Sequence, residues 1–186
     1  VDGTAASATT LALTLDTVGT STAAITLDLG KTNAAAATTG TITANNAYVK
    51  VDSTKADVLT TATIAATGTN VLTLTDSAAT LTKVTITGAG SVDLSGAALA
   101  KVTTLDASAS TGAVKAELTE ATKAVTITTG SGNDVIDADA VATALSSANL
   151  GAGNDTLFTG ANLGAFDKGV NGGEGTDIIS ITDGSK

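Results

Sequence analysis

A nine-residue pattern occurs three times near the end of this chain, as TGSGNDVID at 129–137, LGAGNDTLF at 150–158 and GGEGTDIIS at 172–180. Every copy contains a glycine, any residue, a second glycine, any residue, an aspartate, any residue and an aliphatic residue. One copy alone would be read as an ordinary turn, because Gly, Asn and Asp favour turns. Three copies at nearly equal spacing indicate a repeated structural unit instead.

The composition of these turns suits a calcium ion. Paired glycines allow a positive φ, so that successive carbonyl oxygens can point into one hollow. An aspartate at the end of each turn adds a hard anionic oxygen, and the chain contains no His or Cys that would favour zinc, copper or iron. The predicted metal-binding residues are Gly130, Gly132, Asn133, Asp134, Gly151, Gly153, Asn154, Asp155, Gly173, Gly175, Thr176 and Asp177.

The third copy matches the pattern GGxGxDxUx, in which U is an aliphatic residue, at every position. The three copies therefore resemble the calcium-binding nonapeptide of the repeats-in-toxin (RTX) family, and the resemblance covers the last third of the chain directly. It implies a right-handed β-roll or β-helix in which calcium lies between equivalent turns of neighbouring coils. Three stacked turns would then offer two shared sites, between the turns that end at Asp134, Asp155 and Asp177.

A period of 21 to 22 residues extends beyond the calcium turns. Aliphatic residues that we expect to point inward are spaced 22, 22, 21 and 22 residues apart, at Val92, Val114, Ile136, Leu157 and Ile179. A second apolar set lies about half a period away, so each repeat should contain two short strands. The predicted fold is an all-β parallel β-solenoid over residues 71–186, whose coils bury their apolar residues by stacking. The turns at 87–91 and 108–113 lack the aspartate, so the coils that contain them should bind no metal.

Residues 1–70 are assigned to a separate unit, because no such period is evident there. Two of their segments alternate apolar and small polar residues, which predicts half-buried strands, and Asn45 with Asn46 predicts a hairpin turn. We expect a small antiparallel β-module that covers the first coil of the solenoid. Within the solenoid, residues 137–150 predict one short helix with Asp139 as its N-cap.

Composition and charge exclude several functional classes. The net charge of −9 disfavours binding to nucleic acid and to anionic membranes, and it favours divalent cations. No stretch is long and apolar enough to predict a membrane span. Without His or Cys the chain has no usual nucleophile and base pair, so we expect no enzymatic activity.

The resemblance to RTX proteins gives a functional expectation. An acidic, cysteine-free chain rich in Thr, Ala and Gly, with RTX-like turns near one end, is similar to part of a bacterial surface-layer protein exported by type I secretion. Such a chain would fold on calcium binding outside the cell and associate with itself in a lattice on the cell surface. The alternative is the calcium-binding roll of a secreted RTX toxin, protease, lipase or adhesin.

Overall fold

The computed structural model describes residues 10–28, 38–52, 59–75, 80–97, 99–118, 121–139, 147–160 and 169–182. Within these ranges the regular secondary structure consists of β-strands, which form two sheets of eight strands each. One sheet contains β1 (Thr10–Asp16), β3 (Thr39–Asn45), β5 (Thr61–Thr67), β7 (Lys83–Gly88), β9 (Thr104–Ser110), β11 (Thr126–Thr128), β13 (Ser147–Asn149) and β15 (Val170–Asn171). The other contains β2 (Ile25–Asp28), β4 (Tyr48–Asp52), β6 (Thr69–Thr75), β8 (Ser91–Leu94), β10 (Val114–Glu117), β12 (Val135–Ala138), β14 (Thr156–Gly160) and β16 (Ile178–Thr182).

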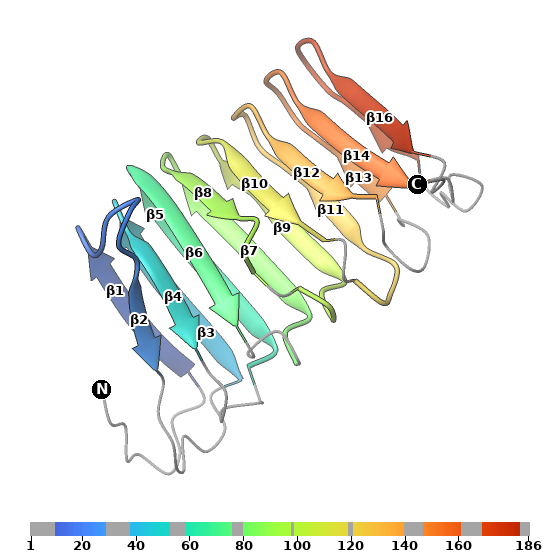
Figure 1. Ribbon diagram of the computed structural model, residues 1–186. Coiled ribbons are helices and arrows are strands. Elements are labelled where there is room, and N and C mark those ends of the chain that lie inside the picture. The colour runs from blue at the N-terminus through green and yellow to red at the C-terminus, as the bar shows by residue number, and fades with distance from the viewer. Residues whose placement is uncertain are drawn as a thin grey trace.

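The chain alternates between the two sheets, so that each coil adds one strand to each of them (Figure 1). Neighbouring strands in a sheet come from consecutive coils and pair in parallel, as β8 with β10 and β12 with β14. The predicted parallel β-solenoid is therefore confirmed. Stacking coils in this way gives every strand a main-chain partner from the next coil along the chain.

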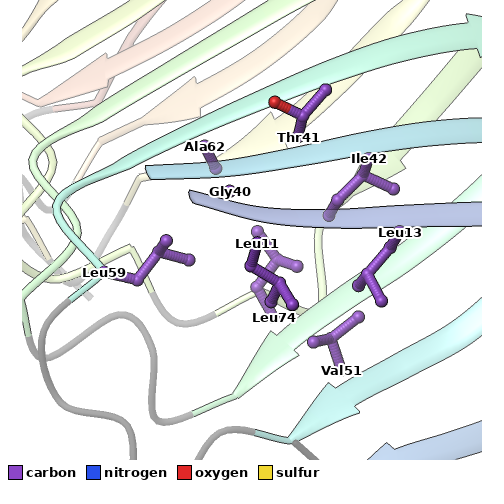
Figure 2. Close-up of a pocket in the computed structure, with 9 residues that line it drawn as sticks. All are labelled: Leu11, Leu13, Gly40, Thr41, Ile42, Val51, Leu59, Ala62 and Leu74. Carbon is purple, nitrogen blue, oxygen red and sulfur yellow. The ribbon is translucent and has the colours of Figure 1, made fainter. Parts of the chain in front are cut away.

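The core lies between the two sheets and is built from alternate residues of each strand. In β5, Ala62, Ile64 and Ala66 are buried, and in β6 Leu72 and Leu74 are buried from the other side. The residues between them are mostly threonines, whose branched side chains suit the outer face of a strand. An apolar void of about 20 Å³ remains near the N-terminal end of this core (Figure 2). It is lined by Leu11, Leu13, Gly40, Thr41, Ile42, Val51, Leu59, Ala62 and Leu74.

The predicted antiparallel module at residues 1–70 is wrong for the residues described. Strand β1 pairs in parallel with β3 and β2 with β4, and the same two sheets continue into the later coils. The repeat was present in the sequence, because the buried residues Ile42, Ile64 and Ile86 pair with one another at intervals of 22 residues. Alternation of apolar and polar residues does not distinguish a parallel from an antiparallel strand, which is why the pattern misled.

Of two further local predictions, the structure contradicts one, and the other lies partly outside the described residues. Asn45 is the last residue of β3 and Asn46 follows it before β4, and these two strands belong to opposite sheets, so the asparagines form a corner of the coil and not a hairpin. Asn46 makes this corner with a positive φ of 48°. Residues 140–146 of the helix predicted at 137–150 lie outside the described ranges, and residues 147–149 form β13.

Candidate calcium site

The second glycine of each repeated turn belongs to a column that passes through six coils. A Cβ atom on Gly112 would collide with the main chain of Gly90, and one on Gly132 would collide with the main chain of Gly112. A Cβ atom on each later glycine of the column would likewise collide with the main chain of the glycine before it, because the turns lie too close together to admit a side chain. The column consists of Gly68, Gly90, Gly112, Gly132, Gly153 and Gly175.

The expected positive φ is found in two of the three turns predicted to bind calcium. Gly151 and Gly153 have φ values of 82° and 124°, and the turn at 172–180 has similar values. Gly130 and Gly132 lie outside the positive region, so that part of the prediction is wrong for the first turn. Glycine is required there by close packing, because a Cβ atom on Gly130 would collide with the carbonyl oxygen of Ser110.

The register of the structure places the aspartates in a column of inward-facing residues. Val92 pairs with Val114 as expected, but Ile136 pairs with Ala116 and not with Val114. The residue that continues the valine column is Asp134, two positions earlier than predicted. Together with the valines, the column contains Asn70, Val92, Val114, Asp134, Asp155 and Asp177.

A shorter coil explains this difference of two residues. The turn at 108–113 is longer than the glycine turn of the next coil. Only 20 residues therefore separate equivalent positions in these two coils, such as Ala116 and Ile136. An open hollow of about 460 Å³, lined by both polar and apolar residues, lies at these turns. It is lined by Ser108, Ala109, Ser110, Thr111, Thr129, Gly130, Ser131, Gly151, Ala152 and Glu174.

Each aspartate of the column binds the main chain of the coil before it. The Val114 N–H donates to Asp134 Oδ1 at 2.7 Å, and the Asp134 N–H donates to Asp155 Oδ1 at 2.8 Å. The Asp155 N–H donates to Asp177 Oδ1 at 3.1 Å. One oxygen of each carboxylate is therefore used to fasten neighbouring coils, and the other remains for a different partner.

The residues before these aspartates form a parallel ladder. The Asn154 N–H donates to Asn133 Oδ1 at 2.8 Å, and the Thr176 N–H donates to Asn154 Oδ1 at 2.9 Å. Asn133 and Asn154 thus hold the coil that follows, whereas the aspartates hold the coil that precedes. The predicted site residues are brought together in three stacked turns, with the asparagine oxygens already bound to main-chain donors.

The second carboxylate oxygens of Asp134 and Asp155 have no hydrogen-bond partner. Both residues are only 1 % exposed, and neither Oδ2 atom accepts a hydrogen bond of good geometry. Burial raises the pKa of Asp134 to about 6, and the Asp155 charge adds to the rise, whereas the Val114 N–H, the Thr129 hydroxyl and the Gly130 N–H oppose it. Burial also raises the pKa of Asp155. Two buried acceptor atoms without donors are costly, and a bound cation would satisfy them.

The donor set fits calcium better than a metal held by side chains alone. Among the described residues, no group of three or more His, Cys, Asp or Glu side chains is placed to hold a metal. An ion at Asp134 or Asp155 would therefore take most of its ligands from main-chain carbonyl oxygens. Calcium accepts such sets of neutral oxygens around few carboxylates.

One member of the column was missed from the sequence. Asn70 is buried at 1 % exposure and pairs with Val92, which places it in line with the aspartates. The signal that could have found it is the spacing, because Asn70 follows Gly68 by two residues as Asp134 follows Gly132. Asparagine does not match the aspartate of the calcium pattern, so the pattern alone does not identify Asn70.

No protein-family model, curated protein or solved structure matches the chain. In the part of the chain that the structure describes, no helix is long and apolar enough to cross a membrane. The chain is a parallel β-solenoid compatible with an RTX-type β-roll, with a column of buried carboxylates at its C-terminal turns.

Proposed function

We propose that the C-terminal coils bind calcium between the turns that end at Asp134, Asp155 and Asp177, and that this binding drives their folding. The observation that carries the proposal is the pair of buried Oδ2 atoms on Asp134 and Asp155 that lack a partner. A buried carboxylate without a compensating charge costs several kcal/mol in the folded state. A divalent cation that binds the folded coils and not the unfolded chain removes this cost and adds its binding free energy to folding.

A proton is the competing occupant of the same oxygens. With a pKa of about 6, Asp134 is largely ionised at neutral pH, so a proton alone does not satisfy it there. Calcium supplies two positive charges to oxygen ligands at that pH. The chain's own contribution is to bury the carboxylates, to hold one oxygen of each by a main-chain N–H, and to stack the turns closely through glycine.

The biological role that best fits calcium-dependent folding of the C-terminal coils is structural and extracellular. Extracellular calcium modules bind the ion at about 10⁻⁴ to 10⁻³ M, a concentration that cytosol does not provide. A chain with such sites leaves a cell unfolded and folds outside, as the resemblance of residues 129–180 to RTX turns implies. The role is that of a calcium-dependent part of a bacterial surface-layer protein, exported by type I secretion.

Self-association in a lattice is the second part of this role. Strand β16 exposes Ile178, Ile179 and Ile181 at 59 %, 41 % and 55 %, although Ile179 continues the buried column of Leu157. An open sheet edge with apolar side chains is covered either by a further coil or by another chain. Electron microscopy of the chain in calcium would give ordered two-dimensional arrays. Dispersed particles at every calcium concentration would favour the alternative, a calcium roll of a secreted toxin, protease, lipase or adhesin.

Isothermal titration calorimetry tests the calcium site itself. Titration of the chain with calcium chloride should give saturable binding with dissociation constants of about 10⁻⁴ to 10⁻³ M or tighter. Magnesium chloride is the matched control, and it should bind more weakly because magnesium requires a rigid octahedral site. Absence of calcium binding, together with an unchanged melting temperature in chelator, would contradict the proposal.

A further inference from the structure

Asn70 occupies the same place in its coil as Asp134 and Asp155 occupy in theirs. Strand pairing puts Asn70 beside Val92, Val92 beside Val114, and Val114 beside Asp134. All three polar side chains are 1 % exposed, and each follows a glycine of the same column by two residues. Asn70 is thus the asparagine version of the aspartate position.

One side-chain oxygen does the same work in both versions. The Ala47 N–H donates to Asn70 Oδ1 at 3.0 Å, as the Val114 N–H donates to Asp134 Oδ1 at 2.7 Å. In each case the oxygen binds the main chain of the preceding coil at the residue that occupies the same column. The two side chains therefore have the same orientation toward the coil before them.

The second side-chain atom differs between the two versions. Asn70 Nδ2 donates to the carbonyl oxygen of Thr67 at 2.9 Å and to that of Ser91 at 3.1 Å. Thr67 is in the same coil and Ser91 is in the next coil, so the amide joins two coils. Oδ2 of Asp134 and Oδ2 of Asp155 have no partner at all. An oxygen in this place presents an acceptor where Asn70 presents a donor with two hydrogens.

We propose that the Asn70 amide replaces calcium in the N-terminal coils, and that Asn or Asp at this column decides whether a coil closes without the ion. The proposal rests on the calcium sites proposed above. Asn70 joins carbonyl oxygens of consecutive coils by two hydrogen bonds, whereas the buried Oδ2 of a carboxylate at this position has no hydrogen to donate and is satisfied by a cation instead. Val92 and Val114, which are apolar and need no partner, separate the amide-closed part of the column from the carboxylate part.

The reciprocal variants Asn70→Asp and Asp134→Asn test this assignment in the full chain. In chelator, Asn70→Asp should speed amide hydrogen exchange in peptides that cover 45–75 and lower the melting temperature by about 5 to 10 °C. Calcium chloride at about 10 mM, well above the range of weak extracellular sites, should reverse at least half of both effects. Asp134→Asn should slow exchange at 131–137 in chelator and remove one calcium ion from the titration.

Asn70→Ala is the matched control, because it removes the amide without adding a charge. It should speed exchange at 45–75 equally in chelator and in calcium. The assignment of Asn70 is overturned if Asn70→Asp behaves like Asn70→Ala, with no recovery in calcium, or if Asp134→Asn still depends on calcium at 131–137.

The same variants separate this inference from the proposed function. If the wild-type chain binds no calcium, the proposed function fails. Slower exchange of Asp134→Asn in chelator would then still support the amide as the group that closes a coil, and unchanged exchange would overturn both proposals. If the wild-type chain binds calcium and Asn70→Asp is not recovered by it, the inference alone fails.

Discussion

Asp155 is the side chain on which both proposed calcium sites depend. It accepts the N–H of Asp134 on one side and its own N–H donates to Asp177 on the other, so it links three consecutive coils. Its Oδ2 atom is buried without a partner. A change at this residue affects the coil before it and the coil after it at the same time.

Substitution of Asp155 by alanine should therefore weaken calcium binding at two sites. We expect the affinity to fall by about tenfold or more and the number of bound ions to decrease, because a carboxylate ligand is lost where few exist. Asp106→Ala is the control, since Asp106 lies on the outer side of β9 and binds Ser108 Oγ at 2.7 Å. Calorimetric titration of both variants checks this, and equal affinities for the two would contradict it.

The pKa of Asp134 predicts how stability depends on pH when calcium is absent. The folded state raises this pKa from 3.8 to about 6, so the folded chain binds a proton more tightly than the unfolded chain does. Its contribution therefore stabilises the folded state as pH falls from 7 toward 4. Thermal melts in chelator at pH 7.5 and pH 5.5 should show the higher melting temperature at pH 5.5.

Calcium should reverse this dependence, because protons compete with the ion for the same carboxylate. With calcium present, affinity should fall as pH falls below about 6, the pKa of Asp134. The variant Asp134→Asn cannot gain this proton and is the control for melts in chelator. If Asp134→Asn in chelator keeps the full increase in melting temperature at pH 5.5, another group is responsible.

At the scale of the element, the glycine turns are held by contact between main chains. Gly132 has no positive φ, yet a Cβ atom there would collide with the main chain of Gly112 and with the nitrogen of Ala113. Gly169 is the opposite case, with a φ of 82° and no atom within 4 Å of such a Cβ. Substitution of Gly132 therefore tests the effect of crowding alone, and substitution of Gly169 tests the effect of backbone strain alone.

Gly132→Ala should destabilise the chain by about 2 kcal/mol or more, because the turns must move apart to admit the methyl group. Gly169→Ala should cost about 1 kcal/mol, the usual penalty of a left-handed conformation for a residue with a Cβ. Chemical denaturation of the two variants, both in calcium, measures the difference. A larger loss for Gly169→Ala would show that stacking is not what requires the column.

The turns were the part of the structure most readable from sequence. A glycine and an aspartate two residues later identify 129–137, 150–158 and 172–180 without ambiguity, and the structure stacks all three. Asn70 was missed because an asparagine can be recognised as the equivalent of these aspartates only when the strand register is known. The misplaced step between Val114 and Ile136 has a similar origin, because a coil shortened by two residues keeps the inward alternation of apolar residues intact.

At the scale of the whole molecule, one continuous stack contains two kinds of coil. The buried pairs Ile42 with Ile64 and Ile64 with Ile86 run through the N-terminal coils, whose described residues place no carboxylate in the core. The sequence did not reveal that β1 and β2 each pair in parallel with a strand of the next coil, because apolar and polar residues alternate in parallel and antiparallel strands alike. The length of the solenoid was therefore underestimated from sequence, although its class was predicted correctly.

This division predicts that calcium removal acts on one end of the stack. In chelator, amide hydrogen exchange should become faster in β12, β14 and β16, while β3, β5 and β7 should exchange as they do in calcium. The reason is that coils in a solenoid contact only their neighbours, so a local loss does not spread through the whole chain. Exchange measured by mass spectrometry on the full chain checks this, and uniform acceleration in all strands would contradict it.

The central claim is that a divalent cation satisfies the two buried oxygens at the turns. Crystals of the chain grown in calcium, or with terbium in its place, can be examined by anomalous diffraction. The account predicts anomalous peaks about 2.3 to 2.6 Å from Oδ2 of Asp134 and of Asp155. Ordered turns with no peak at either oxygen, or with peaks only elsewhere, would contradict it.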